Sequence, residues 1–326
     1  IDPHEHLLGG SGEGGLALQT PMLFLREIVR AGITTVVGTL GVDTTMKTIS
    51  GLLARVKALA SEGLSTRMWS GGYNVPPTTV MNSIREDMLF VDEVVGAGEV
   101  AISDERGLNQ SSQELAKLVR DTHVGGLLSG KAGITHFHVG EERTRLAPLR
   151  EIVEHFQVKP EWLYPTHIER SEALMREAID FANEGSFVDM DVVDMELARW
   201  LSFYIENGGP LDKLTISSDA DSATPDMFMR QLCELVVKHG YSLDFVLPLV
   251  TRNPATVLKL QNKGTLEVGC DADILILDRG TLAVREVIAG GRRMVSDGSP
   301  VEHEKFLEKS YRNIDLVGEK YHEMAD

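Results

Sequence analysis

The chain has 326 residues, of which 42% are hydrophobic, and a formal net charge of -17. That length can bury a large core, whereas the negative charge argues against nonspecific binding to nucleic acid, whose phosphates attract the opposite sign. No run approaches the roughly 20 apolar residues of a membrane span, and two distant cysteines, Cys233 and Cys270, favour a reducing cytoplasm over a disulfide framework.

The chain opens with Asp2-Pro3-His4-Glu5-His6, in a short run that predicts a β-strand. Successive side chains of a strand point to opposite faces, so His4 and His6 share one face and Glu5 points away. Two imidazoles on one face can hold one cation, but such a pair alone is more often without a metal. Further ligands have to come from the rest of the chain.

Short apolar or β-branched runs then alternate with amphipathic helical stretches. The later strand-like runs are 33–38, 66–71, 99–104, 134–138, 162–167, 187–191 and 214–219. Helical stretches with apolar residues at three- and four-residue spacing include 22–31, 48–60, 174–182 and 227–238. Strand and helix alternating eight times predict an α/β fold, a (β/α)8 TIM-type barrel over residues 1–258.

Metal-type residues lie at the ends of these predicted strands, where barrels of this kind carry their catalytic sites. They are His4, His6, Glu99, His138, His167 and Asp219. Each alone has a structural explanation, since His138 can be a satisfied core histidine and Asp219 can cap the next helix. Six such coincidences at one mouth have odds of roughly one in twenty. His136, deeper in its strand, is predicted to pack or to support a ligand.

The order of these residues resembles the amidohydrolase superfamily: His-x-His on strand one, an acidic residue on strand four, single histidines on strands five and six, and an aspartate on strand eight. Within that superfamily, four segments resemble the isoaspartyl dipeptidase (β-aspartyl peptidase) family. They are residues 6–13, 71–76, 101–106 and 165–170. The likeness covers nearly the whole chain.

The resemblance implies a binuclear metallopeptidase that hydrolyses β-aspartyl (isoaspartyl) dipeptides with a hydroxide bridging two divalent ions. His4, His6 and Asp219 would hold one ion. His138 and His167 would hold the other, with Glu99 between the two. Histidine-rich ligation with carboxylates suits Zn2+, which makes bound water a nucleophile near neutral pH.

The same resemblance assigns catalytic and recognition roles. Asp219 would pass a proton to the leaving amine, and Tyr73, after Gly71-Gly72, would donate to the developing oxyanion, in a segment that suggests a mobile lid. A β-aspartyl dipeptide carries one ammonium and two carboxylates, so Glu13 would bind the ammonium and Arg106 and Arg170 the carboxylates. Without the resemblance, the glycine-rich segment 9–12 before Glu13 indicates a flexible surface loop, and both arginines indicate ordinary surface cations.

Three positions depart from the family pattern. Glu99 replaces a carbamylated lysine of the same charge but greater length, so it either bridges two ions or binds one. Ala223, between Ser222 and Thr224, replaces a serine near the substrate, and Val42 replaces a threonine. Two alternatives therefore stay open: another amidohydrolase reaction, such as N-acyl amino acid deacylation or cyclic-amide opening, and a noncatalytic barrel subunit.

Residues 259–326 resemble the C-terminal part of the small β-domain that flanks amidohydrolase barrels, followed by a polar tail. A strand is predicted over 271–278 and a hairpin across Ala289-Gly290-Gly291. Because the family normally enters the barrel from strands of this domain, the small β-domain is expected to be incomplete at its N-terminus. The family also tends to assemble, which implies a homo-oligomer, and its partner is a small dipeptide rather than nucleic acid or membrane.

Overall fold

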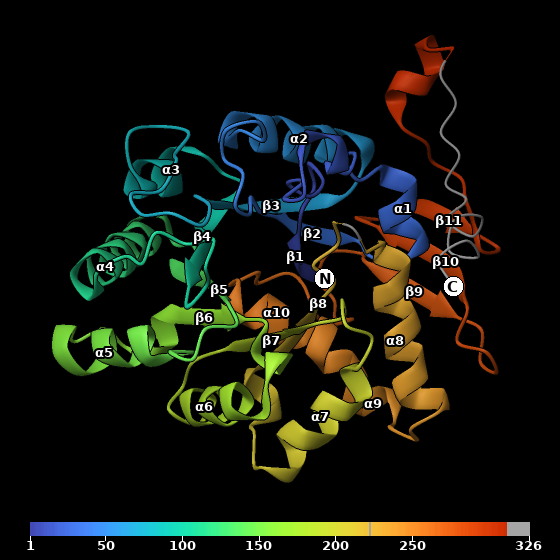
Figure 1. Cartoon of the computed structure of the whole chain (residues 1–326). Coiled ribbons are helices and arrows are strands. Elements are labelled where there is room, and N and C mark those ends of the chain that lie inside the picture. Colours follow the sequence, from blue (N-terminus) through green and yellow to red (C-terminus); the bar gives the residue numbers. More distant parts are fainter. Residues whose placement is uncertain (222, 312–326) are drawn as a thin grey trace.

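The computed structural model describes residues 1–221 and 223–311, and parallel strands lie at its centre within a ring of helices (Figure 1). The strands are β1 (Asp2–Glu5), β2 (Thr35–Gly38), β3 (Ser65–Ser70), β4 (Val94–Ile102), β5 (Ile134–Val139), β6 (Leu163–Thr166), β7 (Val188–Asp191) and β8 (Leu214–Ser217). The ring contains α1 (Leu25–Arg30), α2 (Ile49–Glu62), α3 (Ile84–Phe90), α4 (Ser112–Ser129), α5 (Ala147–Phe156), α6 (Glu172–Asn183), α7 (Leu197–Glu206) and α8 (Pro225–Val237). This arrangement confirms the predicted TIM-like α/β fold.

The central strands are hydrogen-bonded as six plus two. β1 to β6 form a parallel sheet in chain order, and β7 pairs with β8. β8 returns to β1 through an isolated bridge between Glu5 and Ala220. Between β6 and β7, Pro165 has no N–H to donate, and side chains make the connection, since the Thr166 hydroxyl donates to Asp189 at 2.8 Å. The predicted eight strands are therefore all present, but within the described residues no backbone ladder joins β6 to β7, and a single bridge joins the β8 side to β1.

The central strands are buried on both faces, as expected when helices cover a parallel sheet. Alternate residues face opposite ways: Val36 and Met68 join the large core that includes the helices, while Val37 and Trp69 join a smaller cluster. Leu258, directly after α10 (Arg252–Val257), packs into that smaller cluster. The interior of the barrel is thus filled by side chains.

The fourth strand differs from its prediction. β4 runs over Val94–Ile102 rather than 99–104, so Glu99 lies inside the strand instead of at its end. The pairing of β4 with β5 shifts by one residue between Ala97 and Val100, which marks a bulge. Gly98 has φ of 151°, and a Cβ there would lie 2.8 Å from the Cβ of His136. A bulge of this kind redirects a side chain, here that of Glu99.

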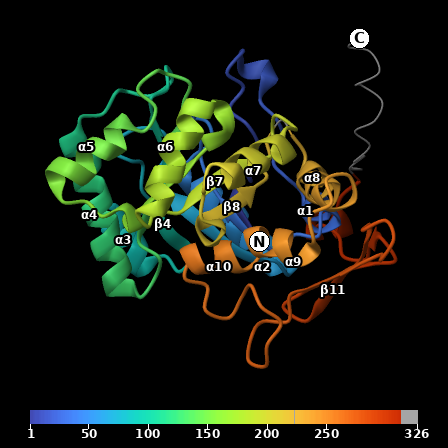
Figure 2. The ribbon, with the colours of Figure 1, turned by 90° about the horizontal axis from the view of Figure 1, so that it is seen from below.

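An antiparallel sheet lies beside the barrel, next to α1 (Figures 1 and 2). It has the order β12 (Ser299–Pro300), β11 (Arg292–Ser296), β10 (Val284–Ala289), β9 (Ile274–Leu277). The predicted hairpin is confirmed, with Gly290 and Gly291 at φ of 54° and 83° in its turn. A short 3-10 helix, Lys305–Lys309, begins the predicted polar tail, of which residues 312–326 lie outside the described part. The division of the chain at residue 258 remains a prediction.

No helix within residues 1–221 and 223–311 combines the length and the apolar character needed to cross a membrane.

Candidate active site

The first group of ligand-type residues lies where β8 returns to β1. The Nε2 atoms of His4 and His6 each lie 3.2 Å from Oδ1 of Asp219. Backbone bonds hold this arrangement, because the Asp219 N–H donates to the His4 carbonyl and the His6 N–H to that of Ala220, both at 3.1 Å. Asp219 has φ of 45°, in the left-handed region that residues other than glycine seldom adopt. That turn carries its carboxylate toward both imidazoles.

Glu99 is buried among all four predicted histidine ligands. Its Oε1 lies 3.5 Å from Nε2 of His6. Its Oε2 lies 3.5 Å from His4, 3.3 Å from His138 and 3.7 Å from His167. Burial alone raises the pKa of Glu99, but the charge of His4 and the hydrogen bonds with His138 and His167 outweigh burial and hold the pKa well below its usual range. Glu99 is therefore an anion with one oxygen toward His6 and the other toward the remaining three.

The centre fits a divalent metal ion. His4 Nε2, Glu99 Oε1 and Asp219 Oδ1 are buried and make no hydrogen bond of good geometry. Buried polar atoms normally have partners, so these three atoms, all on predicted ligands, support a site for a cation. Ligand atoms within 4.8 Å of one another form three groups: His4, His6 and Asp219; His4, Glu99 and His167; His167, Asp191 and Asp219. Imidazole and carboxylate donors suit Zn2+.

The carboxylates hold protons on two histidines of the metal-free protein. Burial lowers the pKa of His4, but Glu99 and Asp219 outweigh it and raise the pKa to about 10. Burial also opposes the charge on His167, whose hydrogen bonds to Asp191 and Glu99 raise its pKa to about 9. A metal ion would therefore displace protons from both imidazoles.

His138 differs from the other three predicted histidine ligands because, within the described residues, it belongs to none of these three groups of ligand atoms. Burial, followed by the charge of His167, lowers its pKa below the ordinary 6.5. Its Nδ1 lies 3.3 Å from Glu99 and 2.9 Å from the Tyr73 hydroxyl. The structure thus places His138 beside the metal-type centre, in contact with the predicted oxyanion donor.

Two aspartates that the sequence analysis missed hold the outer nitrogens of histidines. Asp191 Oδ2 lies 2.6 Å from Nδ1 of His167, and Asp104 Oδ2 lies 2.9 Å from Nε2 of His138. His167 itself has φ of 62°. Asp191 ends β7 and Asp104 lies two residues after β4, so the strand-end criterion that selected the other candidates also applies to them. A carboxylate on the second nitrogen sets the ring orientation of a ligand histidine.

His136 is fully buried below the metal-type centre, in agreement with its prediction. Its ring stacks on Trp69 with centroids 4.9 Å apart. Its Nε2 lies 3.0 Å from Nδ1 of His4, and its Nδ1 lies 2.9 Å from the carbonyl oxygen of Tyr164. His136 therefore contacts a predicted ligand without facing the centre itself.

The predicted recognition residues meet at the same mouth. Arg106 donates to both oxygens of Asp104, from Nε at 2.8 Å and from Nη2 at 2.7 Å. Its Nη1 donates to Glu13 at 3.0 Å. The loop that brings Glu13 over the barrel contains Gly9 and Gly12, at φ of 80° and 72°. Glu13 and Arg106 were predicted to bind opposite charges of one substrate, and here they bind each other.

Arg170 and Tyr73 complete this mouth. Nη2 of Arg170 lies 3.5 Å from Nε2 of His138. Tyr73 is buried, and burial together with the charge of Glu99 raises the pKa of its phenol well above 10.0. The phenol therefore keeps its proton and can act as a donor. The mobile-lid hypothesis for Gly71-Gly72 stays a prediction.

A polar cavity of about 90 Å³ joins these residues. It is lined by His6, Ser11, Glu13, Gly41, Val42, Tyr73, Glu99, Arg106, His138, His167, Arg170, Asp219 and Asp221. Val42, one of the departures from the family pattern, thus lies at the mouth, and Asp221 was not predicted. Ala223 is not in the lining, and Ser222 lies outside the described residues. Ser11 lies in segment 6–13, which resembles the family, whereas Gly41 had no sequence signal, because a loop glycine matches no motif.

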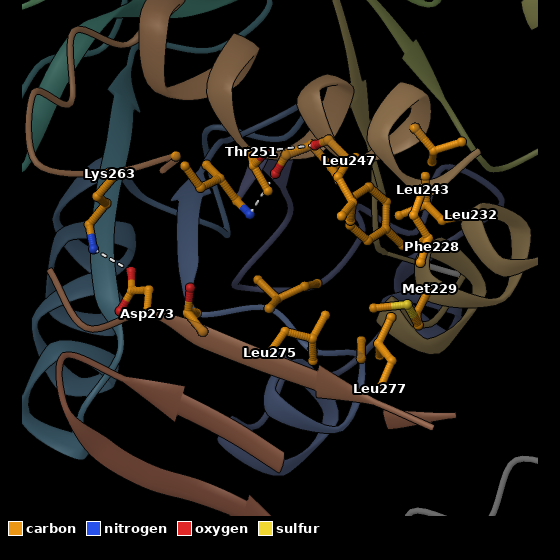
Figure 3. A pocket seen from close by; sticks show the side chains of 18 of the residues that line it. Phe228, Met229, Leu232, Leu243, Leu247, Thr251, Lys263, Asp273, Leu275 and Leu277 are labelled. Carbon is orange, nitrogen blue, oxygen red and sulfur yellow. Dashed lines mark hydrogen bonds and ion pairs between the residues drawn. The ribbon is translucent and has the colours of Figure 1, made fainter. Parts of the chain in front are cut away.

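A larger cavity, of about 320 Å³, lies away from this mouth. Figure 3 shows Leu275 and Leu277 of β9 on one side and Phe228 and Met229 of α8 on the other. Its lining is mostly aliphatic, with the Lys263–Asp273 ion pair at one end. Among the described residues, its lining contains no histidine and none of the groups of ligand atoms described above, so the candidate active site is the smaller polar cavity.

Comparisons with known proteins agree with this placement. The Amidohydrolase family matches the chain over residues 219–301. The β-aspartyl dipeptidase of the thermophilic, keratin-degrading Fervidobacterium islandicum AW-1 is 37% identical, with a TM-score of 0.88, over 97% of this chain and 84% of that one. The same enzyme in complex with β-Asp-Leu dipeptide is 36% identical, with a TM-score of 0.87, over 97% of this chain and 86% of that one.

A D-hydantoinase shares the fold at 16% identity and a TM-score of 0.61, over 93% of this chain and 86% of that one.

Proposed function

The chain belongs to the isoaspartyl (β-aspartyl) dipeptidase family of the amidohydrolase superfamily, and on that premise we propose that it hydrolyses β-aspartyl dipeptides at the polar cavity. Members of this superfamily are metal-dependent hydrolases of amide and related bonds. The relative that holds β-Asp-Leu supports a dipeptide as the substrate. The observation that carries the proposal is the joint placement of His6, Glu99 and Asp219 beside Glu13 and Arg106 in one cavity.

We propose that these residues hold two metal ions and that the metal is zinc. His4, His6 and Asp219 would hold one ion, and His138 and His167 the other, with Glu99 between them. His138 joins this set through Nδ1, which faces Glu99 while Asp104 holds Nε2. When bound, divalent ions supply a nucleophilic water near neutral pH and polarise the scissile carbonyl.

Protein groups supply the proton transfer and the orientation. Asp219 is an anion, because burial, which raises its pKa, is outweighed by His4 and His6, so its carboxylate can accept a proton and pass it to the leaving amine. Tyr73, protonated at neutral pH, would donate to the oxygen on which charge develops. With His138 Nδ1 committed to an ion, the Tyr73 hydroxyl, which contacts that nitrogen at 2.9 Å, would be free to donate to the substrate oxygen.

Charge complementarity supports recognition of a zwitterion. The ammonium of the substrate would replace Arg106 on Glu13, and a substrate carboxylate would take the freed Nη1 of Arg106 together with Arg170. Glu13 and Arg106, which lie 3.0 Å apart, would each lose the other as a partner. In the complex each would regain an opposite charge from the substrate. A substrate with only one of these charges leaves one partner uncompensated.

The test is hydrolysis of β-aspartyl-leucine by the zinc-loaded protein, with α-aspartyl-leucine as the matched substrate. Selective cleavage of the β-linked peptide supports the proposal. Cleavage of neither peptide by protein that holds zinc contradicts the substrate and favours an N-acyl amino acid or a cyclic amide. Absence of bound zinc after loading contradicts the metal-dependent reaction itself and favours a noncatalytic subunit.

Glu13→Gln separates the two enzymatic alternatives. Removing the anion that faces the ammonium should lower kcat/KM for β-aspartyl-leucine by about 100-fold, because a charge-assisted hydrogen bond at a recognition site contributes up to about 3 kcal/mol. A deacylase, whose substrates lack the free ammonium, would be nearly unaffected. The neighbouring exposed Glu105→Gln is the control.

We further propose a cytoplasmic location and a homo-oligomeric state. Cys233 and Cys270 are both free thiols, which supports a reducing compartment. The oligomer rests on the resemblance to the family, and sedimentation of the purified chain tests it.

A further inference from the structure

His4 has an unusual partner for its outer nitrogen. The carboxylates of Asp104 and Asp191 hold His138 and His167. Nδ1 of His4 instead lies 3.0 Å from Nε2 of another imidazole, that of His136. An imidazole can donate or accept at each nitrogen, so this contact has a direction that the rest of the chain must set.

The other nitrogen of His136, Nδ1, sets the direction of this hydrogen bond. The carbonyl oxygen of Tyr164, 2.9 Å from His136 Nδ1, can only accept, so Nδ1 carries a proton. His136 is 0% exposed, and within the described residues neither ring nitrogen lies within 4.0 Å of a carboxylate oxygen. A charged imidazole buried without a counterion is unfavourable, so the ring is neutral and its Nε2 is an acceptor.

We propose that His136 is a positioning residue that fixes the tautomer and the orientation of His4. It accepts the hydrogen bond from Nδ1–H of His4, so that Nε2 of His4, which faces Glu99 and Asp219, is the nitrogen left to bind an ion. The inference rests on the proposed metal site and deepens it by naming the group that prepares this ligand.

The surroundings hold the His136 ring in place. Trp69 stacks on one face at an interplanar angle of 21°, and the Tyr164 ring lies 4.7 Å from it. Gly98, in the β4 bulge, packs closely against His136. Any side chain at that position would collide, because its Cβ would lie 2.8 Å from the Cβ of His136. A ring held on several sides cannot turn to exchange its nitrogens without disturbing this packing.

A neutral acceptor has a specific advantage at this position. His4 already faces two carboxylates, at 3.5 Å and 3.2 Å, which favour its protonated form. A third carboxylate behind it would add further negative charge to a buried centre that already holds two. An imidazole supplies the same orientation without adding negative charge.

Three variants test the inference. His136→Phe keeps a ring on Trp69 but removes the acceptor, while His136→Gln offers an amide oxygen to the same Nδ1–H. Tyr164→Phe is the control, because it removes a buried hydroxyl that bonds Thr215 at 2.6 Å without touching His4. Zinc affinity is measured by competition with a chromogenic chelator, and the denaturant midpoint of each metal-free variant reports the fold.

His136→Phe should weaken zinc binding by about 10- to 100-fold, the usual effect of losing a partner that orients a metal ligand. His136→Gln and Tyr164→Phe should retain affinity close to that of the parent chain. Equal zinc affinity of His136→Phe and the parent overturns the inference and leaves the proposed function intact. A parent chain that binds no zinc contradicts the proposed function instead.

The tautomer can be read without any variant that risks the fold. In the metal-free parent chain, 15N NMR of the histidine rings should show His136 protonated at Nδ1 and unprotonated at Nε2. Protonation of His136 at Nε2 overturns the inference directly. Loss of these two signals in His136→Gln makes the assignment.

Discussion

Glu99 is the residue on which the number of bound ions depends. A glutamate is shorter than the carbamylated lysine of the better-known family members, yet its two oxygens lie 3.3 to 3.7 Å from nitrogens of four histidines. The pairing of β4 with β5 shifts beside Gly98, and a bulge of this kind redirects the neighbouring side chain of Glu99. Its carboxylate is thus positioned for the proposed bridge without a longer side chain.

Glu99→Gln should lower the zinc content of the protein from two ions to one or none, because an amide cannot balance two cations, and should weaken the remaining binding by about 100-fold. Metal analysis after gel filtration measures the stoichiometry. The exposed Glu105→Gln is the control. One ion in the parent chain, unchanged in the variant, would show that Glu99 does not bridge.

Arg106 joins the metal side of the cavity to the substrate side. Its guanidinium donates two bonds to Asp104, which also holds His138, and a third to Glu13. Burial opposes the charge on Asp104, but these bonds keep its pKa well below the ordinary 3.8. A lysine has one ammonium and cannot reproduce this fork.

Arg106→Lys should therefore lower kcat/KM for β-aspartyl-leucine by about 10- to 100-fold, mostly through KM, because bidentate recognition of a carboxylate is lost. Steady-state kinetics of the zinc-loaded protein measures the effect. The exposed Arg143→Lys should behave as the parent chain. An unchanged KM would remove Arg106 from substrate recognition.

Among the elements, helices with local end signals were predicted best. The stretch 48–60 became α2 (Ile49–Glu62), where Thr48 caps the start and Gly63, at φ of 116°, ends it. The strand β4 was placed too late because Gly96 and Gly98 weaken the strand pattern in its first half. Its true start depends on pairing with β3 and β5, which neighbouring residues do not encode.

α4 offers a test of an end signal. Ser111 accepts from the Glu114 N–H and Glu114 bonds back to the Ser111 N–H, a capping box. Ser111→Ala should lower the free energy of unfolding by about 1 kcal/mol, because orphan N–H groups of the first turn lose their partner. Denaturant unfolding measures it, with Ser112→Ala as the neighbouring control. Zinc content should not change, and a change would mean that α4 acts on the site.

For the molecule as a whole, metal and protons compete for the same imidazoles. The pKa values of His4 and His167 are about 10 and about 9 in the metal-free fold, above the ordinary 6.5. Their protonated forms stabilise that fold, and the contribution is complete below pH 6.5 and lost as the pH rises through 9 and 10.

The stability of the metal-free protein should therefore fall between pH 7 and pH 10, while zinc affinity should rise over the same interval because zinc binds unprotonated imidazole. Chemical unfolding with and without zinc at several pH values measures both. Metal-free stability that rises across this interval would contradict the assignment of protonated His4 and His167.

The sequence by itself determined the strand and helix alternation and the six ligand-type residues, which follow from local periodicity and residue type. The recognition roles of Glu13, Arg106 and Arg170 stay a prediction that rests on the resemblance to the family. Only the tertiary structure decided that Glu13 binds Arg106 and that Asp104, Asp191 and His136 support the histidines. It also decided that β6 and β7 meet through side chains. Each of these depends on distances between segments far apart in the chain, and those distances exist only after the barrel has closed.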